Sequence, residues 1–199
     1  MQKITHLLFL LPLICLVVLG VCLERPSVSR EAFRQALAAA RAHTGQPLRR
    51  GTLIVVDYAQ PSQTKRLAVM NLATGRVEHY ARTAHGKNTG GIWAERFSNR
   101  EGSLQSSLGL FEVGELFSGK HGLSFRLIGL DPQRNSMALR RGIIIHAAPY
   151  VSATSMLLNW RSGFRLGRSE GCFALSADDL AELSRPLARP AYLYAHAEE

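Results

Sequence analysis

The sequence predicts a mainly β fold, a sandwich or barrel of short strands with a few peripheral helices. Two observations support this class: short runs rich in Val, Ile, Leu and Phe recur between turn signals, and few segments repeat apolar residues at helical spacing. Beyond an apolar N-terminal segment, about 175 residues remain, which is enough for one domain with its own core and too few for two.

The N-terminal segment indicates export. An unbroken apolar run over 7–23 follows the short positive start 1–3, and Glu24 ends it. The run is longer than most signal-peptide cores and short for a membrane span. We therefore expect residues 1–25 to be a signal peptide or an N-terminal membrane anchor, which contacts the membrane if it is not cleaved. A lipoprotein signal at Cys22 and a buried core helix are the alternatives.

A helix is predicted next. Ser29 suits an N-cap, residues 30–43 repeat apolar side chains at helical spacing, and Gly45 suits the residue after the helix. We expect residues 26–50 to form a helical lead-in to a domain at 51–199.

The strands of this domain follow in order. Residues 52–59 predict a buried strand, and 66–72 with 77–83 predict a hairpin around the turn 73–76. Further strands are predicted at 107–113, 123–130, 142–146 and 192–196. Helices capped by Ser152 and Ser176 are predicted at 153–160 and 177–185. Residues 85–108, rich in Gly, Ser and Asn, form a long loop, and such loops are usually functional.

The net charge of +9 does not indicate nucleic-acid binding, because the 24 Lys and Arg residues are scattered singly and in pairs. Outside the cytoplasm, anionic wall polymer and phospholipid headgroups are the partners that this charge favours. Much of it is expected to be solvated surface.

Cys172, in the stretch GRSEGCFAL, is the candidate nucleophile. The only other cysteines, Cys15 and Cys22, lie in the apolar segment, and a free thiol in an oxidising compartment needs a reason to persist. Arg165 and Arg168 lie nearby in sequence and would favour the thiolate. The alternative is a buried cysteine that acts as a small apolar side chain.

His146 is the candidate base, because it ends the buried run 142–146 where a strand meets a loop. A core histidine without catalytic function is the alternative. No CxxC, HxH or HExxH spacing indicates a metal site, no GxSxG indicates a serine nucleophile, and no cofactor is expected.

These residues resemble a known family. His146-Ala147 followed by Ser169-Glu170-Gly171-Cys172 is similar to the HG and S-x-G-C signature of YkuD-type cysteine L,D-transpeptidases. The chain more closely resembles the murein L,D-transpeptidase catalytic domain family, over about residues 53–175, through its 26-residue His-to-Cys interval and the runs AHGKNTGG, FSN, GSLQSSLG, GKHG, IIIHAAPYVS and LGRSEGC.

The resemblance implies a YkuD-like sandwich or barrel and assigns roles to single residues. Cys172 becomes the acyl-accepting nucleophile, His146 its general base, and the main-chain carbonyl of Ala147 the third member of the triad. Main-chain N–H groups around Gly171 would stabilise the oxyanion. We expect substrate contacts from Arg168, Ser169, Tyr150, His85, Ser98 and Asn99.

Some positions depart from the family pattern. Ala147 replaces the usual glycine, Glu170 stands where many members carry an oxyanion-stabilising histidine, and Phe173-Ala174 replaces the usual Asn or Arg after the cysteine.

The implied activity is transfer of a peptidoglycan tetrapeptide stem, with release of D-Ala, from a Cys172 thioester to an amine. An L,D-carboxypeptidase that uses water, and a wall-binding homologue without catalysis, are alternatives. A cysteine peptidase of unrelated fold would instead place a helix start at the cysteine. We expect a monomer in the bacterial cell envelope, outside the cytoplasm, bound to peptidoglycan stem peptides and not to nucleic acid.

Overall fold

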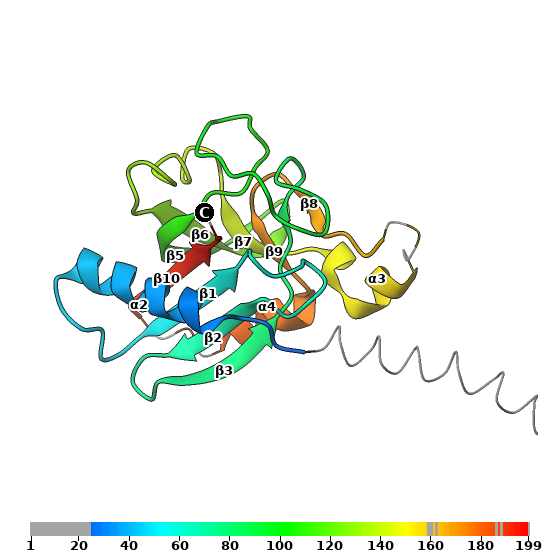
Figure 1. The fold of residues 1–199 in the computed structure, drawn as a ribbon. Coiled ribbons are helices and arrows are strands. Elements are labelled where there is room, and N and C mark those ends of the chain that lie inside the picture. Colours follow the sequence, from blue (N-terminus) through cyan, green and yellow to red (C-terminus); the bar gives the residue numbers. More distant parts are fainter. Residues whose placement is uncertain (1–24, 159–160, 162, 186, 188, 199) are drawn as a thin grey trace, which may run out of the picture.

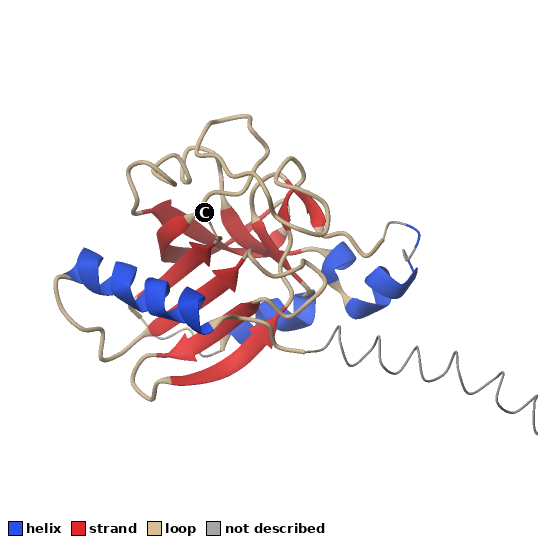
Figure 2. Cartoon of the chain, viewed as in Figure 1, coloured by secondary structure: helices blue, strands red, loops and turns tan. Residues whose placement is uncertain are grey.

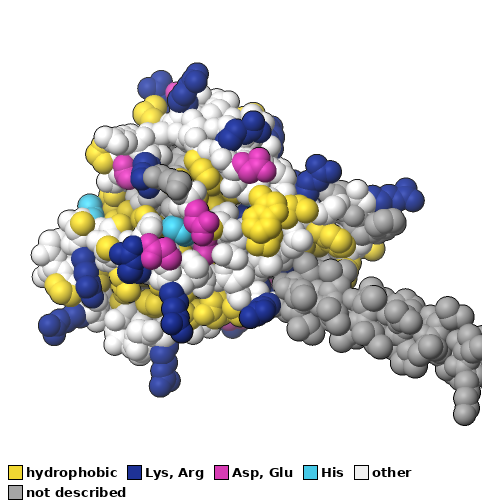
Figure 3. All heavy atoms as spheres, viewed as in Figure 1, with side chains coloured by type: hydrophobic (Ala, Val, Ile, Leu, Met, Phe, Trp, Pro, Cys, Tyr) yellow, Lys and Arg dark blue, Asp and Glu magenta, His cyan; other side chains and the backbone are white. Residues whose placement is uncertain are grey.

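A computed structural model describes residues 25–158, 161, 163–185, 187 and 189–198. The expected signal peptide or anchor at 1–25 therefore lies, except for Arg25, outside the described residues. Within the described ranges, no helix is both long and apolar enough to cross a membrane. Lys and Arg side chains are dispersed over the face that Figure 3 shows rather than gathered into a band.

The fold is mainly β, as the sequence predicts (Figures 1 and 2). In the described part of the chain, eight strands form one mixed sheet in the order β3-β2-β1-β10-β5-β6-β7-β9. The pairs β1/β10 and β7/β9 are parallel, and the other neighbours are antiparallel. The bounds are β1 Thr52–Asp57, β2 Leu67–Asn71, β3 Arg76–Ala81, β5 Gly109–Gly119, β6 Gly122–Gly129, β7 Ile144–Ala147, β9 Phe173–Leu175 and β10 Ala191–His196.

The sheet curls strongly, so the expected barrel-like form is confirmed. Helix α4, Ala177–Ser184, contacts both β3 at one edge and β7 near the opposite edge. On the inner side, Phe173 of edge strand β9 packs edge to face on Phe111 of β5, with ring centroids 5.6 Å apart. A curled sheet brings such distant strands together, because its inner face wraps around one apolar core.

Helix α2, Arg30–Thr44, covers the outer face of the sheet at β1 and β10. The Ser29 hydroxyl accepts a hydrogen bond from the Ala32 N–H at 3.1 Å, and Gly45 ends the helix with a φ of 68°. Ala32, Ala36 and Ala40 recur every four residues and are fully buried. These small side chains allow the helix to approach the sheet closely, and the predicted helix is confirmed.

Several elements differ from the expectation. Strand β5 extends to Gly119, so β5 and β6 form a hairpin whose turn is Lys120–His121. The short strands β4, His85–Gly86, and β8, Gly167–Ser169, pair in a second sheet, and neither was predicted, nor was β9. Helix α3 spans Ala153–Leu158 after a 3₁₀ turn at 149–151, and the rest of the helix expected to residue 160 lies outside the described residues.

Candidate active site

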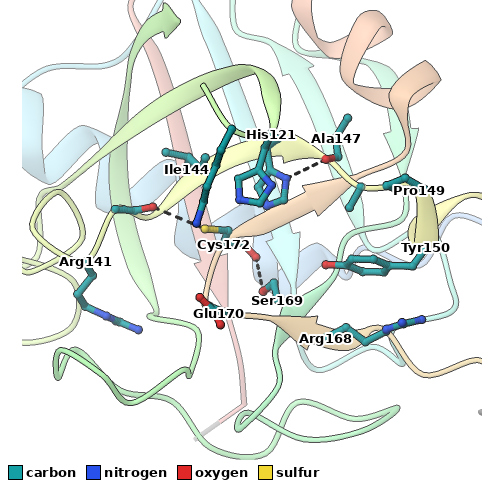
Figure 4. Close-up of a pocket in the computed structure, with 14 residues that line it drawn as sticks. His121, Arg141, Ile144, Ala147, Pro149, Tyr150, Arg168, Ser169, Glu170 and Cys172 are labelled. Atoms are coloured by element: carbon teal, nitrogen blue, oxygen red, sulfur yellow. Dashed lines mark hydrogen bonds between the residues drawn. The ribbon is translucent and has the colours of Figure 1, made fainter. Parts of the chain in front are cut away.

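A pocket of about 610 Å³ lies between β7, the β5–β6 turn and the segment from β8 to Cys172 (Figure 4). The parallel pairing of β7 with β9 places His146 opposite Ala174, two residues after Cys172. The pocket lining brings together six of the residues that the sequence singled out: Cys172, His146, Ala147, Tyr150, Arg168 and Ser169. The curled sheet thus assembles side chains that are far apart in the chain.

The His146 ring is held by its own strand end. Its Nδ1 lies 2.8 Å from the carbonyl oxygen of Ala147. Because a carbonyl oxygen only accepts, Nδ1 carries the proton and Nε2 keeps a free lone pair. Burial lowers the pKa of His146, the bond to Ala147 opposes this shift, and the charges of His121 and Lys120 add to the lowering. The imidazole is therefore neutral at neutral pH and able to accept a proton.

Cys172 is partly exposed, and its Sγ lies 3.6 Å from the Gly142 carbonyl oxygen. Burial raises the pKa of the thiol, against a main-chain hydrogen bond from Ile144 and the charges of Lys120 and Arg141. The thiol is thus protonated at neutral pH and needs a base to become a nucleophile. The expectation that Arg165 and Arg168 favour the thiolate needs correction, because the cations that act on it come from other parts of the chain.

Ser169 closes the turn that carries the cysteine. Its hydroxyl donates to the Cys172 carbonyl at 2.8 Å (Figure 4) and accepts from the Gly171 N–H at 3.2 Å. Gly171 is buried and has a φ of 115°, which few other residues adopt. The structure therefore directs this N–H into the turn, and does not present it to the pocket as the oxyanion donor that we expected.

Glu170, which departs from the pattern of the family that the sequence resembles, lines the pocket. Its carboxylate pairs with Lys87 at 3.1 Å, and this hydrogen bond lowers its pKa. The group is consequently ionised and held toward Lys87. An ionised carboxylate cannot stabilise an oxyanion, so another group has to do so.

Tyr150 and Arg168 form the side of the pocket away from Arg141 in Figure 4. The Arg168 guanidinium lies over the Tyr150 ring, 4.8 Å from its centroid. Burial raises the pKa of Tyr150 to about 12, so its hydroxyl remains a hydrogen-bond donor. This pair offers a charged fork and a hydroxyl to a ligand.

The structure does not bring His85, Ser98 or Asn99 to this pocket. His85 is fully buried between the Arg66 Nη2 at 2.7 Å and the Gly90 carbonyl at 3.1 Å, and so has no surface to offer a substrate. Ser98 and Asn99 line a separate, smaller pocket. Asn99 bonds to Ser136 at 3.0 Å, because this part of the long loop folds back onto residues 131–137.

Three basic residues of the lining were not among the predicted site residues: Lys120, His121 and Arg141. The His121 ring stacks on His146 with centroids 4.2 Å apart. The run GKHG was visible in the sequence, but its place beside His146 depends on β6 pairing with β7. No local pattern specifies which strands pair.

A buried histidine at the end of a strand and a partly exposed cysteine line one pocket of a curled β sheet. This arrangement is typical of proteins that carry a cysteine–histidine pair. Residues 24–196 match the family model described as L,D-transpeptidase catalytic domain, and the chain belongs to this family. The enzymes of this family act on peptidoglycan, a polymer of the cell envelope. Strand β9 begins directly after Cys172, so the cysteine peptidase of unrelated fold, with a helix at that point, is ruled out.

Solved structures resemble this chain at low identity. The helical cell shape determining protein Pgp2 from Campylobacter jejuni is 16% identical, with a TM-score of 0.49 over 75% of this chain and 48% of its own. An L,D-transpeptidase from Mycobacterium smegmatis is 15% identical, with a TM-score of 0.44 over 74% and 59% of the two chains. L,D-transpeptidase 3 from Mycobacterium tuberculosis, with a faropenem-derived adduct, is 14% identical, with a TM-score of 0.45 over 74% and 60%.

The chain spans about half to three fifths of the length of these solved proteins. No curated protein matches its sequence.

Proposed function

We propose that this chain is a cysteine L,D-transpeptidase that transfers peptide stems of peptidoglycan through a thioester on Cys172. One observation carries the proposal: Cys172 and His146 line the same pocket, and the Ala147 carbonyl fixes the histidine with its Nε2 lone pair free. A protonated thiol beside a neutral imidazole is the starting state that general-base activation requires.

The first half-reaction forms the thioester. The Cys172 Sγ attacks the carbonyl carbon on the L-centre side of the L,D-peptide bond in a tetrapeptide stem, while its proton passes to Nε2 of His146. The bond from this carbon to the nitrogen of the terminal D-Ala then breaks, and the departing amine takes the proton from His146. The products are free D-Ala and an acyl group on sulfur.

The second half-reaction returns the enzyme to its starting state. An amine of a second stem, typically the diaminopimelate side chain, attacks the thioester carbonyl and gives a proton to His146. The carbon–sulfur bond breaks, and the Cys172 thiolate regains the proton. The product is a 3→3 cross-link. Water in place of the amine would make the same residues an L,D-carboxypeptidase, the second candidate for this site.

The substrate contacts that we propose come from residues that line the pocket. Arg168 and Tyr150 present a guanidinium and a hydroxyl that suit a stem-peptide carboxylate. Lys120 and His121 also line the pocket, and both act electrostatically on His146. Because Glu170 is ionised, we assign the stabilisation of the oxyanion to the Lys120 ammonium and to the main chain, not to residue 170.

The place of action is the cell envelope, with the segment at 1–25 as a signal peptide or anchor that exports the domain. A wall-binding homologue without catalysis remains the contrasting function, and the ion pair between Glu170 and Lys87 is the feature that favours it. Such a homologue would bind the stem peptide without releasing D-Ala.

The deciding experiment incubates the purified protein with tetrapeptide muropeptides and analyses the products by mass spectrometry. We expect 3→3 cross-linked dimers with release of D-Ala, and neither product from Cys172→Ala. Tripeptide without dimers would identify the carboxypeptidase. Absence of both products from the folded wild-type protein, with retained muropeptide binding, would establish the non-catalytic homologue and refute the proposal.

A further inference from the structure

Arg141 is a partly buried cation that the long loop surrounds. Its Nη1 donates to the Ser98 carbonyl at 2.7 Å and to the Ser107 hydroxyl, while Nη2 donates to the Gln105 carbonyl and to the Ser103 hydroxyl. All four acceptors belong to the loop 85–108, and Arg141 itself lies just before β7. One side chain therefore ties that loop to the strand that carries His146.

These acceptors satisfy the guanidinium without neutralising it. Each of the four is a carbonyl or a hydroxyl oxygen and carries no charge. Arg141 also lines the pocket of Cys172 (Figure 4). Its positive charge thus faces the nucleophile in a partly buried setting, where charges interact more strongly than in water.

The same guanidinium lies against the turn of the nucleophile. A Cβ placed on Gly171 would stand 2.8 Å from the Gln105 carbonyl oxygen and 3.1 Å from Nη2 of Arg141. The first distance is shorter than real side chains tolerate, so glycine is needed there for close approach as well as for its φ. Loop, guanidinium and nucleophile turn are in mutual contact at this point.

We propose that Arg141 is a positioning residue for the acyl transfer: it clamps the loop segment 98–107 onto the Cys172 turn and supplies a fixed positive charge that favours the thiolate. This inference rests on the proposed function and names a group outside its triad. Burial raises the pKa of the Cys172 thiol and lowers that of the Arg141 guanidinium, and the attraction between the two groups opposes both shifts.

Other groups also face the thiol, and a test has to hold them constant. They come from the β5–β6 turn, β7, β8, the 3₁₀ turn, the chain after β1 and the nucleophile turn itself, and they are Lys120, His121, His146, Arg168, Tyr150, Tyr58 and Glu170. Substitution at residue 141 alone leaves all of them in place.

The experiment measures the pH dependence of Cys172 alkylation by iodoacetamide, which needs a thiolate but no transpeptidase activity. Arg141→Met should raise the alkylation midpoint by roughly one pH unit, the scale of a lost neighbouring charge. Arg141→Lys should keep the midpoint near that of the wild type. The matched control is Arg140→Met, which removes an exposed arginine paired with Glu101 at 3.0 Å and should leave the midpoint unchanged.

The clamp has its own readout, the rate at which a protease cuts within residues 98–107. A single ammonium cannot reach all four acceptors. A protease should therefore cut the loop several-fold faster in the Arg141→Lys variant than in the Arg140→Met variant. An unshifted alkylation midpoint in a folded Arg141→Met protein would refute the claim that the Arg141 charge favours the thiolate. A raised midpoint in Arg141→Lys would refute it as well. Equal rates of loop cleavage in Arg141→Lys and in the wild type would refute the claim that Arg141 clamps the loop. If the alkylation and proteolysis results are as expected but the wild-type protein forms no cross-links, only the proposed function is refuted.

Discussion

The rings of His121 and His146 stack with their centroids 4.2 Å apart and an interplanar angle of 26°. One ring comes from the β5–β6 turn and the other from β7, so the hairpin supports the base from outside its own strand. The contact is electrostatic as well as steric, because the charge of His121 lowers the pKa of His146.

Replacing His121 separates these two effects. His121→Phe keeps a flat ring in the stack and removes the neighbouring charge, so the pKa of His146 should rise and the acid limb of the acylation rate should move to higher pH. In the wild type, this limb should lie below the ordinary histidine value of about 6.5. His121→Ala should also lose rate at its pH optimum. Identical profiles for wild type and His121→Phe would contradict the electrostatic part.

Removing the Ser169 hydroxyl tests the nucleophile turn. Ser169→Ala loses the bonds to the Cys172 carbonyl and to the Gly171 N–H, so the turn should relax and acylation should fall on the order of tenfold. The pH midpoint of Cys172 alkylation should move little, because no charge is lost. Wild-type acylation kinetics in a folded Ser169→Ala protein would show that the hydroxyl does not position the turn.

Arg168 gives a prediction opposite to the one that sequence proximity suggests. It lies over Tyr150, while the cations that lower the pKa of Cys172 are Lys120 and Arg141. Arg168→Gln should therefore leave the alkylation midpoint unchanged and raise the apparent KM for the stem donor by roughly tenfold. A shifted midpoint with unchanged KM would show that Arg168 acts on the thiol and not on the substrate.

The sequence predicts strands well where β-branched runs are long, and it predicts the helices with clear caps, as at Ser29 and Ser176. It misses β8, whose residues Gly167, Arg168 and Ser169 carry no apolar pattern. Cys172 and His146 could be identified from the sequence, because a free cysteine and a histidine at the end of a buried strand are rare in a β domain that is expected to be exported.

The rest of the site depends on pairing between distant segments. Arg165 and Arg168 are close to Cys172 along the chain, but Lys120 and Arg141 reach it in space, since β6 and β7 are neighbours in the sheet. Ser98 and Asn99 of the long loop were expected to contact the substrate. Instead, Gln105 approaches the nucleophile turn, while Asn99 turns away toward Ser136.

The buried pair of Arg66 and His85 predicts a loss of stability in acid. Burial lowers the pKa of His85 to about 3, helped by the Arg66 charge. Between the unfolded value of about 6.5 and this folded value, the unfolded chain binds a proton that the folded protein does not. Stability should therefore fall as the pH falls through this window, by up to about 1.4 kcal/mol per pH unit for this group.

His85→Gln keeps a polar side chain beside Arg66 and removes the titrating ring. The thermal midpoint, followed from pH 7 to about pH 4.5, should fall less steeply in this variant than in the wild type. The exposed His43→Gln serves as a control and should keep the wild-type slope. Equal slopes for His85→Gln and wild type would show that His85 titrates normally in the folded protein.

The most direct test of the central claim, that Cys172 accepts an acyl group with His146 as its base, is the intact mass of the protein after exposure to imipenem, a carbapenem that acylates nucleophiles. We predict one adduct, mapped to the peptide with Cys172, that is absent from Cys172→Ala and forms on the order of a hundredfold more slowly in His146→Ala. A folded wild-type protein without an adduct, or an adduct that persists in Cys172→Ala, would contradict the account.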